Sequence, residues 1–133
     1  MAVSDEAQIN KITVDLERFT EGQVKRVGLS IMNNLYMDTP VDTGFARSNW
    51  HVSYGTPQEA IAGSKESVTD TFFSAGLAMI EAWSMGLGSI YITNSVPYIG
   101  RLNDGWSKQA PSSFVQMAVA RALASAKAAV DYV

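Results

Sequence analysis

The stretch SIYITNSVPYIGRLNDGWSKQAP, residues 89–111, joins a short strand to a connection rich in turn residues and aromatic side chains. At its start, Ile90 and Ile92 alternate with Tyr91 and Thr93. That period of two is typical of a β-strand whose faces meet different surroundings. The stretch therefore predicts a strand that places its isoleucines on one face.

The connection after this strand carries turn residues between apolar anchors. Pro97 holds the preceding Val96 in an extended conformation. Asn103-Asp104-Gly105 predicts a reversal, because glycine accepts the positive φ that tight turns often need. A short apolar cluster that predicts one helical turn lies between them: Tyr98, Ile99 and Leu102. We expect the large rings of Tyr98 and Trp106 to anchor the connection by burial.

A helix is predicted downstream of the connection. Ser113 and Gln116 have the spacing of a capping box, which places the helix start there. An apolar face follows, formed by Val115, Val119, Leu123, Ala126 and Val130. Seven of the twelve residues from 118 to 129 are alanine, so the helix has a thin surface that allows close packing.

Upstream of the strand, a second helix follows a segment with few apolar residues. Residues 55–69 contain Gly, Pro, Ser and charged residues, and they predict an extended loop or a hairpin arm around Ala62-Gly63-Ser64, with strand ends on its limbs. Asp70 is the expected cap of the helix. Its apolar face consists of Phe72, Phe73, Leu77, Ile80 and Trp83. Residues 85–88, MGLG, are expected to close it.

Before the arm, alternation of Trp50, Val52 and Tyr54 predicts a half-buried strand. His51 is the single histidine and lies on the polar phase of that strand, so we expect it to be exposed or at an interface. Preceding it, residues 41–44, VDTG, predict a turn in which the Asp42 carboxylate accepts backbone N–H groups.

The remaining N-terminal part predicts one long helix after a flexible arm. Residues 1–13 are polar with scattered apolar side chains, which is typical of a flexible arm rather than a secretory signal. From about Val14 to Asp38, apolar residues recur at helical spacing: Leu16, Phe19, Val24, Val27, Ile31 and Leu35. Thr39-Pro40 ends this helix. The order of elements predicts a single α+β domain, residues 1–133, with a small antiparallel sheet of three to four strands packed by N-terminal, middle and C-terminal helices.

Composition narrows the function classes. Charged residues are 17% of the 133-residue chain and apolar residues 47%, so little charge is present to cover the surface. We take this as a sign that neighbouring molecules cover part of it. The net charge of −3 disfavours a nucleic-acid-binding face. No apolar run approaches the roughly 20 residues of a membrane span.

The sequence offers no recognisable catalytic or ligand-binding motif, so we expect no enzyme activity, no cofactor and no metal. Cysteine is absent, which removes thiol nucleophiles and cysteine metal ligands. There is no paired-carboxylate motif, no GxSxG, no phosphate-binding loop and no zinc spacing. Asp42, His51 and Ser107 could be grouped as a triad, but such trios occur in any chain of this size.

Two blocks of the sequence resemble the neck or tail-completion proteins of tailed bacteriophages, a head–tail joining family. The downstream block comprises Tyr91, Ile92, Thr93, Asn94, Val96, Pro97, Tyr98, Leu102 and residues 105–111, GWSKQAP. The upstream block comprises residues 39–44, TPVDTG, with Arg47 and Trp50. With the flanking helices, the resemblance covers about Leu16 to about Leu123. One position departs from the family pattern, because Asn103 replaces a residue that is often acidic.

The resemblance implies a structural role for the two blocks and a ring-forming role for the chain. The residues expected to build the structural motif are Asp42, Thr43, Gly44, Arg47, Trp50, Asn94, Pro97, Tyr98, Gly105, Trp106, Ser107 and Pro111. The family implies a cyclic assembly, most often of six copies, in the virion between the connector or adaptor proteins and the tail tube. Double-stranded DNA passes through its lumen without specific binding, no membrane is involved, and assembly takes place in the bacterial host cytoplasm. Alternatives are another neck layer, such as a twelve-copy head-completion adaptor, and a small enzyme.

Overall fold

A computed structural model describes residues 11–12, 20–41, 44–105 and 113–131, with side chains for 20–41, 44–105 and 113–125. The described elements are β1 (Lys11–Ile12), α2 (Glu21–Asp38), η1 (Arg47–Asn49), β2 (His51–Tyr54), α3 (Phe72–Ala82), η2 (Met85–Leu87), β3 (Ile90–Thr93), α4 (Ile99–Asn103) and α5 (Phe114–Asp131). Among these helices, none has both the length and the apolar character needed to cross a bilayer.

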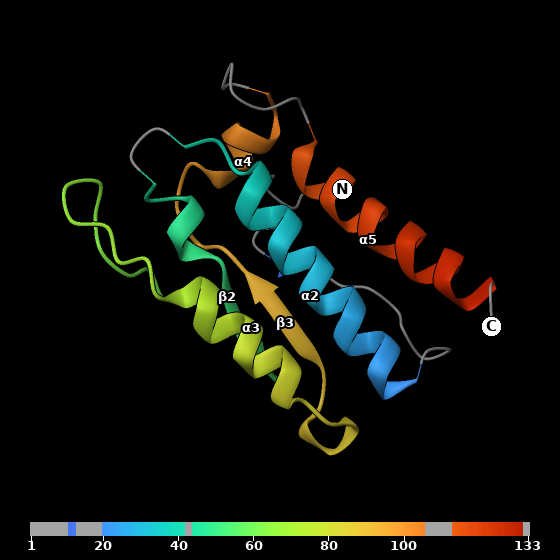
Figure 1. Ribbon diagram of the computed structural model, residues 1–133. Helices are drawn as coiled ribbons and strands as arrows, with labels where there is room; N and C mark the ends of the chain where they lie inside the picture. The colour runs from blue at the N-terminus through green and yellow to red at the C-terminus, as the bar shows by residue number, and fades with distance from the viewer. Residues whose placement is uncertain (1–10, 13–19, 42–43, 106–112, 132–133) are drawn as a thin grey trace, which may run out of the picture.

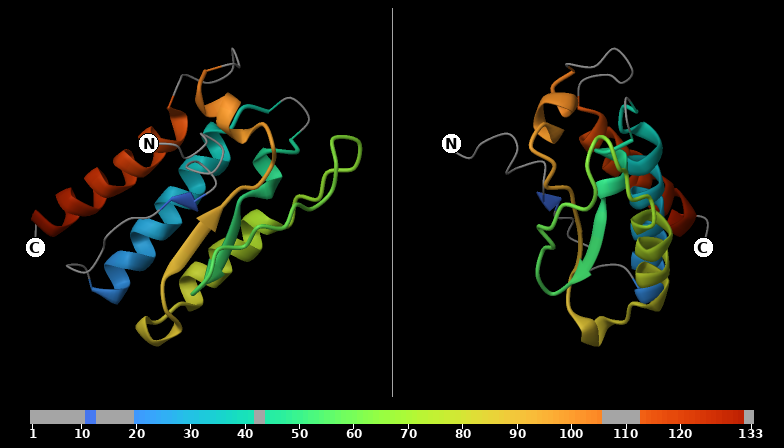
Figure 2. Two further views of the ribbon diagram at one scale, coloured as in Figure 1. Left: turned by 180° about the vertical axis from the view of Figure 1, so that it is seen from behind. Right: turned by 90° about the vertical axis from the view of Figure 1, so that its left-hand side faces the viewer.

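The chain forms an α+β domain of two layers. Helices α3, α2 and α5 lie side by side with α2 in the middle, and the sheet covers one face of the helix layer (Figures 1 and 2). The core lies between the layers and at the end where α4 packs. Its buried apolar residues are Val27, Ile31, Met32, Leu35, Phe45, Ala46, Trp50, Val52, Ile80, Ile92, Val96, Ile99, Phe114, Val115, Ala118 and Ala122.

The sheet is small and antiparallel. Strands β2 and β3 pair along their whole length, with His51 opposite Thr93 and Tyr54 opposite Ile90. β1 adds two residues at the other edge of β3. The predicted sheet of three to four strands is not confirmed in that form, because β2 and β3 are its two four-residue strands and residues 55–69 contribute none.

Helix α2 begins later than its apolar pattern predicts. Thr20 is the N-cap in an extended conformation, and it forms a capping box with Gln23. The Thr20 hydroxyl accepts from the Gln23 N–H at 3.3 Å, and the Gln23 side chain accepts from the Thr20 N–H at 2.8 Å. A helix that runs unbroken from Val14 is therefore wrong, since the extended cap interrupts it. The predicted arm at residues 1–13 lies almost entirely outside the described residues.

Glycines set the close approach of α3 to its neighbours. A Cβ atom on Gly76 would lie 2.8 Å from Cγ2 of Val52 in β2 and 3.0 Å from Cε of Met32 in α2. A Cβ atom on Gly28 of α2 would lie 3.1 Å from Cγ2 of Ile80. All three distances are shorter than ordinary van der Waals separations, so Gly76 allows α3 to pack closely on β2 and α2, and Gly28 allows α2 to pack closely on α3.

Helix α5 packs against α2 through its small side chains. Val115, Ala118 and Ala122 are buried, and the Asn34 amide of α2 donates to the Ala118 carbonyl at 3.0 Å. The predicted capping box at Ser113 is wrong. Ser113 has a φ of 63°, and the Gln116 side chain accepts a hydrogen bond from Asn103 of α4. The cap thus comes from a different element, as described below.

Residues 55–71 form an arm that projects beside β2 and α3 and contains no helix or strand (Figure 1). The arm turns back at residues 63–67. Ser64 and Ser67 exchange backbone hydrogen bonds of 2.9 and 3.2 Å, and Gly63 has a φ of 74°. The reversal therefore lies where the sequence places it, but the limbs are not strands. The predicted Asp70 cap is wrong, because α3 has Thr71 at its N-cap position and no side-chain cap.

Candidate functional site

The two sequence blocks meet in a buried junction at one end of the domain. Asn94, at the end of β3, is fully buried and donates from its side chain to the Ala46 carbonyl at 2.8 Å. Its Oδ1 accepts from the N–H of Val96 at 3.1 Å, which fixes the turn before Pro97. The rings of Phe45 and Tyr98 lie 6.4 Å apart in a tilted arrangement. Backbone polar groups that are removed from water need such partners, so Asn94 holds the downstream block to the segment that joins Gly44 to Arg47 in the upstream block.

Trp50 connects the upstream block to the end of α2. The indole is 1% exposed, and its N–H donates to the Thr39 hydroxyl at 2.8 Å. That hydroxyl in turn donates to the Leu35 carbonyl at 2.5 Å. The Leu35 carbonyl lies in the last turn of α2, where backbone carbonyls have no partner within the helix. The Thr39 hydroxyl supplies a donor to it, while the Trp50 ring fills the core.

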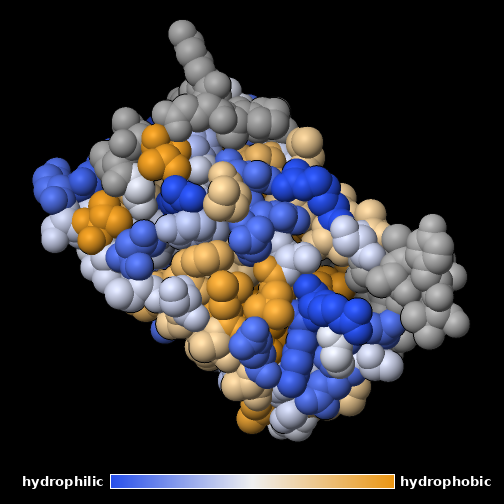
Figure 3. Space-filling model, viewed as in Figure 1, coloured by the Kyte–Doolittle hydropathy of each residue, from blue (hydrophilic) through white to orange (hydrophobic). Residues whose placement is uncertain are grey.

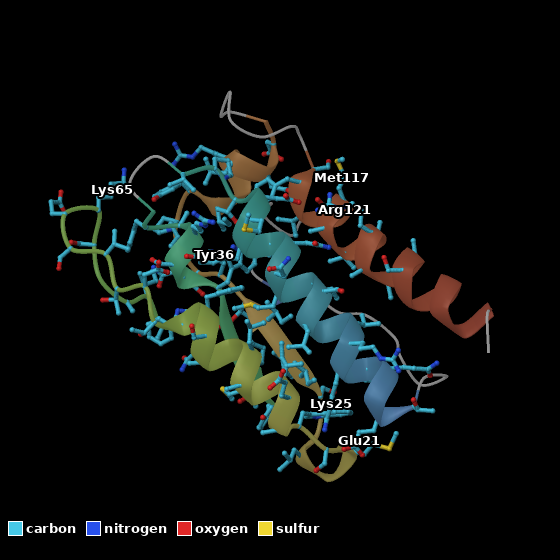
Figure 4. All side chains as sticks on the ribbon, in the orientation of Figure 1. Glu21, Lys25, Tyr36, Lys65, Met117 and Arg121 are labelled. Atoms are coloured by element: carbon cyan, nitrogen blue, oxygen red, sulfur yellow. The ribbon has the colours of Figure 1, made fainter. Side chains whose placement is uncertain are left out.

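Arg47 lies against Tyr36, which is labelled in Figure 4, at the same helix end. Its guanidinium lies 4.0 Å from the ring centroid, and its Nε donates to the Tyr36 carbonyl at 2.9 Å. Phe73 of α3 stacks on Tyr36 at 4.1 Å. The Tyr36 hydroxyl donates to Asp70 at 2.9 Å, which explains why Asp70 does not cap α3. Burial, and then the Asp70 hydrogen bond, raise the pKa of Tyr36, so the phenol remains a neutral donor.

The arm is fixed to the domain at three places along its limbs. Asn49 bonds both backbone groups of Ala62: its Oδ1 accepts from the N–H at 2.8 Å, and its Nδ2 donates to the carbonyl at 3.0 Å. Thr93 of β3 donates its hydroxyl to the Gln58 carbonyl. The Asp70 contact with Tyr36 fixes the second limb. The first limb therefore lies across the face of the sheet that carries no helix.

His51 is covered at this face, contrary to the prediction that it is exposed or at an interface. The side chain is 5% exposed, its ring lies 4.4 Å from that of Phe72, and its Nε2 lies 3.2 Å from Oδ1 of Asn49. Burial lowers the pKa of His51, because the charged form loses water. An amide oxygen accepts at this position, so the neutral ring carries its proton on Nε2.

Asn103 is a structural residue whose importance the sequence did not indicate. It is buried, its Oδ1 accepts from the N–H of Val115 at 2.9 Å, and its Nδ2 donates to the Gln116 side chain at 2.9 Å. Its carbonyl also accepts from the N–H of Ser113. Asn103 thereby caps α5 from α4. The signal that could have identified it is the departure from the family pattern at this position.

Of the other predicted motif residues, some are half-buried or exposed, and the rest lie outside the described residues. Tyr98 is half-buried against the core, with the Lys65 ammonium of the arm 4.9 Å from its ring centroid. Pro97 and Gly105 are exposed, and Gly44 and Gly105 have positive φ angles of 84° and 89°. Five further motif residues lie outside the described residues: Asp42, Thr43, Trp106, Ser107 and Pro111.

Among the described residues, potential metal ligands are not grouped, and several large apolar side chains are exposed. Within the part of the chain that the structure describes, no three His, Asp or Glu side chains are grouped as metal ligands. His51, the one imidazole of the chain, is held by an amide rather than by a carboxylate. Several large apolar side chains are exposed instead: Met37, Val41, Ile61, Val68, Met85, Leu87 and Met117. Figure 3 shows apolar side chains gathered over the boundary between α2 and α3 and again beside the arm.

Comparison of the chain with known protein families, with curated proteins and with solved structures finds no match.

Proposed function

We propose that this chain is a structural virion protein of a tailed bacteriophage, which forms a ring in the neck between the head connector and the tail. Its role there is tail completion, and DNA passes through the lumen of the ring. The protein acts without catalytic chemistry, cofactor or metal. Its partners are other copies of itself, most often six in total, the connector or adaptor proteins, and the tail tube protein.

The observation that best supports this proposal is the junction between the two blocks that carry the family resemblance. Asn94 and Ala46 are 48 residues apart in sequence and bonded in the core. A pair of motifs that together define a fold is expected to meet in this way, whereas two chance matches have no reason to do so. The junction thus favours a resemblance of whole domains over a likeness of two separate loops.

The surface is consistent with a protein that is covered by neighbours. Seven large apolar side chains in the described residues are more than one third exposed, and Met37 and Met85 each reach 62%. Scattered exposed apolar residues are ordinary, but here they accompany a charged fraction of only 17%. The net charge of −3 suits a lumen that lets DNA pass without holding it.

Another neck layer, such as a twelve-copy adaptor, is the second candidate, because the same features suit any ring of the neck. The copy number separates the two. Native mass spectrometry of the purified protein should give a closed assembly near six times the chain mass of 14.4 kDa. An assembly of twelve supports the adaptor, and a two-fold dimer as the largest species contradicts both.

A further inference from the structure

The turn between α3 and β3 is a rigid knob that presents two large apolar side chains to solvent. We call residues 84–88 the η2 knob. Met85 is 62% exposed and Leu87 is 46% exposed. Two hydrogen bonds fix the conformation of the knob. The buried Trp83 indole donates to the Gly88 carbonyl at 2.7 Å, and the Leu87 N–H donates to the Ser84 carbonyl at 3.0 Å. A fixed turn keeps its methionine and leucine in water, which is costly unless another surface covers them.

A second exposed apolar group lies at the opposite end of the domain. We call Met37, Val41 and Val68 the α2 end. Met37 is in the last turn of α2 and Val41 follows the helix. A Cβ atom on Gly44 would lie 3.9 Å from Cγ1 of Val68, so the arm residue lies beside Gly44.

These two groups cannot meet within one molecule. Gly28 of α2 faces Ile80 of α3, whereas Tyr36 of α2 stacks on Phe73, so the two helices run in opposite directions. The η2 knob, which follows α3, therefore lies near the start of α2, and the α2 end lies at its other terminus (Figure 1). The 18-residue helix between them is about 27 Å long.

Each end also carries one charged side chain that could pair with a charge of opposite sign at the other end. Arg47 lies beside the α2 end, with its Nη2 3.6 Å from Sδ of Met37. Glu81 is exposed on α3, four residues before Met85. Among the described residues the ion pairs are Lys25–Glu21 and Arg121–Asp38, so neither Arg47 nor Glu81 is neutralised by a partner within that part of the chain.

We infer that the η2 knob of one copy docks on the α2 end of the next copy, with Glu81 of the first facing Arg47 of the second. This inference rests on the proposed ring and names its contact. Two different surfaces at opposite ends of one chain make a head-to-tail interface, and such interfaces close into rings when the rotation allows. Five apolar side chains form a small interface, so a single contact is weak. Closing the ring gives every copy two contacts and stabilises the assembly.

Disulfide trapping tests this contact directly, because the chain has no cysteine of its own. The full-length double variant Met37→Cys/Leu87→Cys is oxidised at increasing protein concentration and run on a non-reducing gel. Each copy then carries one cysteine at each end, so the expected product is a ladder of linked copies. Either single variant places a cysteine on only one side of the contact, so it should stay largely monomeric and can form no product larger than a dimer. The matched control is Leu87→Cys/Ala124→Cys, since Ala124 is exposed on α5 and is not one of the α2-end residues.

The same experiment also tests the proposed contact between Glu81 and Arg47, through the yield of disulfide-linked copies. Glu81→Lys in the Met37→Cys/Leu87→Cys background should lower the ladder yield several-fold by repelling Arg47, whereas Glu81→Asp should preserve it. A ladder that is absent at every concentration, or equally strong in the control pair, overturns the contact.

A native mass measurement separates failure of the contact from failure of the ring. A wild-type ring together with no ladder rejects this contact and leaves the proposed function intact. A ladder together with open chains that never close supports the contact and rejects the ring. If Leu87→Ser leaves the ring mass and its dilution stability unchanged, the η2 knob serves a different partner and the inference is wrong.

Discussion

Asn49 holds Ala62 by both of that residue's backbone groups, at 2.8 Å to the N–H and 3.0 Å to the carbonyl. The limb of the arm has no partner strand at this point. The Asn49 side-chain amide makes the two hydrogen bonds that a partner strand would otherwise make. The same Asn49 Oδ1 faces His51, so one buried amide connects the arm, the sheet and the histidine. This contact fixes the arm to the domain at residue 62. The tip of the arm, residues 63–67, lies beyond this contact.

Replacing Asn49 with alanine should destabilise the protein and release the first limb of the arm. The change leaves the half-buried Ala62 backbone groups and the buried His51 Nε2–H without their partner, at a cost of up to about 1–3 kcal/mol for each unsatisfied group. Urea unfolding measures the loss. Asn33→Ala, at an exposed position of α2, is the control and should change stability by no more than about 0.5 kcal/mol. Equal stability of the two variants would contradict the role given to Asn49.

The tip of the arm is expected to be mobile in the free monomer and ordered in the ring. The Ala62 amide is bonded to Asn49 and should exchange slowly in both states. Lys65 and Glu66 are exposed at the turn, so their amides should exchange fast in the monomer and slow markedly on assembly. Hydrogen exchange followed by mass spectrometry reports this. Fast exchange of the tip in the ring would show that the arm takes no part in assembly.

Gly76→Ala should destabilise the domain although alanine favours helices. The added methyl group would lie 2.8 Å from Val52 and 3.0 Å from Met32, and overpacking of this kind costs about 1–3 kcal/mol. Gly22→Ala is the matched control in α2, where nothing lies within 4 Å of the added atom. That variant should gain up to about 1 kcal/mol from helix propensity. Thermal unfolding of both variants should therefore move in opposite directions, and a gain in both would contradict the close packing of α3.

Stability should fall as the pH drops below about 6.5, the ordinary pKa of histidine. Burial lowers the pKa of His51 in the folded state, so between the two pKa values the unfolded chain binds a proton that the folded chain does not. Proton uptake then favours unfolding. Urea unfolding at pH 7.5 and 5.5 should show the loss in the wild type and a smaller loss in His51→Gln. The same loss in both proteins would assign the effect to other groups.

Asn103→Asp should be tolerated, whereas Asn103→Ala should not. Aspartate keeps the oxygen that accepts from Val115, and a negative charge is favourable at the N-terminus of α5. Alanine removes both side-chain hydrogen bonds and should cost about 1–3 kcal/mol. Melting temperatures of the two variants compare these effects. Equal stability of Asn103→Asp would show that an acidic residue, frequent at this position in the family that the sequence resembles, can make the same hydrogen bond to Val115.

The sequence predicted the elements whose signals are local. Alternation from Ile90 to Thr93 located β3, Thr39-Pro40 ended α2 correctly at Asp38, and the apolar face of residues 72–83 located α3. Apolar spacing alone extended α2 too far toward Val14, because the pattern continues across the Thr20 cap.

Features that depend on tertiary contacts were missed. Ser113 and Gln116 have the spacing of a capping box, but Asn103 occupies that role from another element. His51 has the polar phase of an exposed strand residue, yet the arm and Phe72 cover it. No local pattern of residue types predicts which distant segment will cover a face. The meeting of the two blocks through Asn94 is of the same kind.

Electron microscopy of the assembled virion tests the central proposal most directly. With the chain carrying a small visible tag at its C-terminus, the proposal predicts a closed ring of copies, six in number, at the junction of connector and tail tube, with DNA in its lumen. Particles in which the tag is absent from the neck, or in which the chain is present there as a monomer or a two-fold dimer, would contradict it.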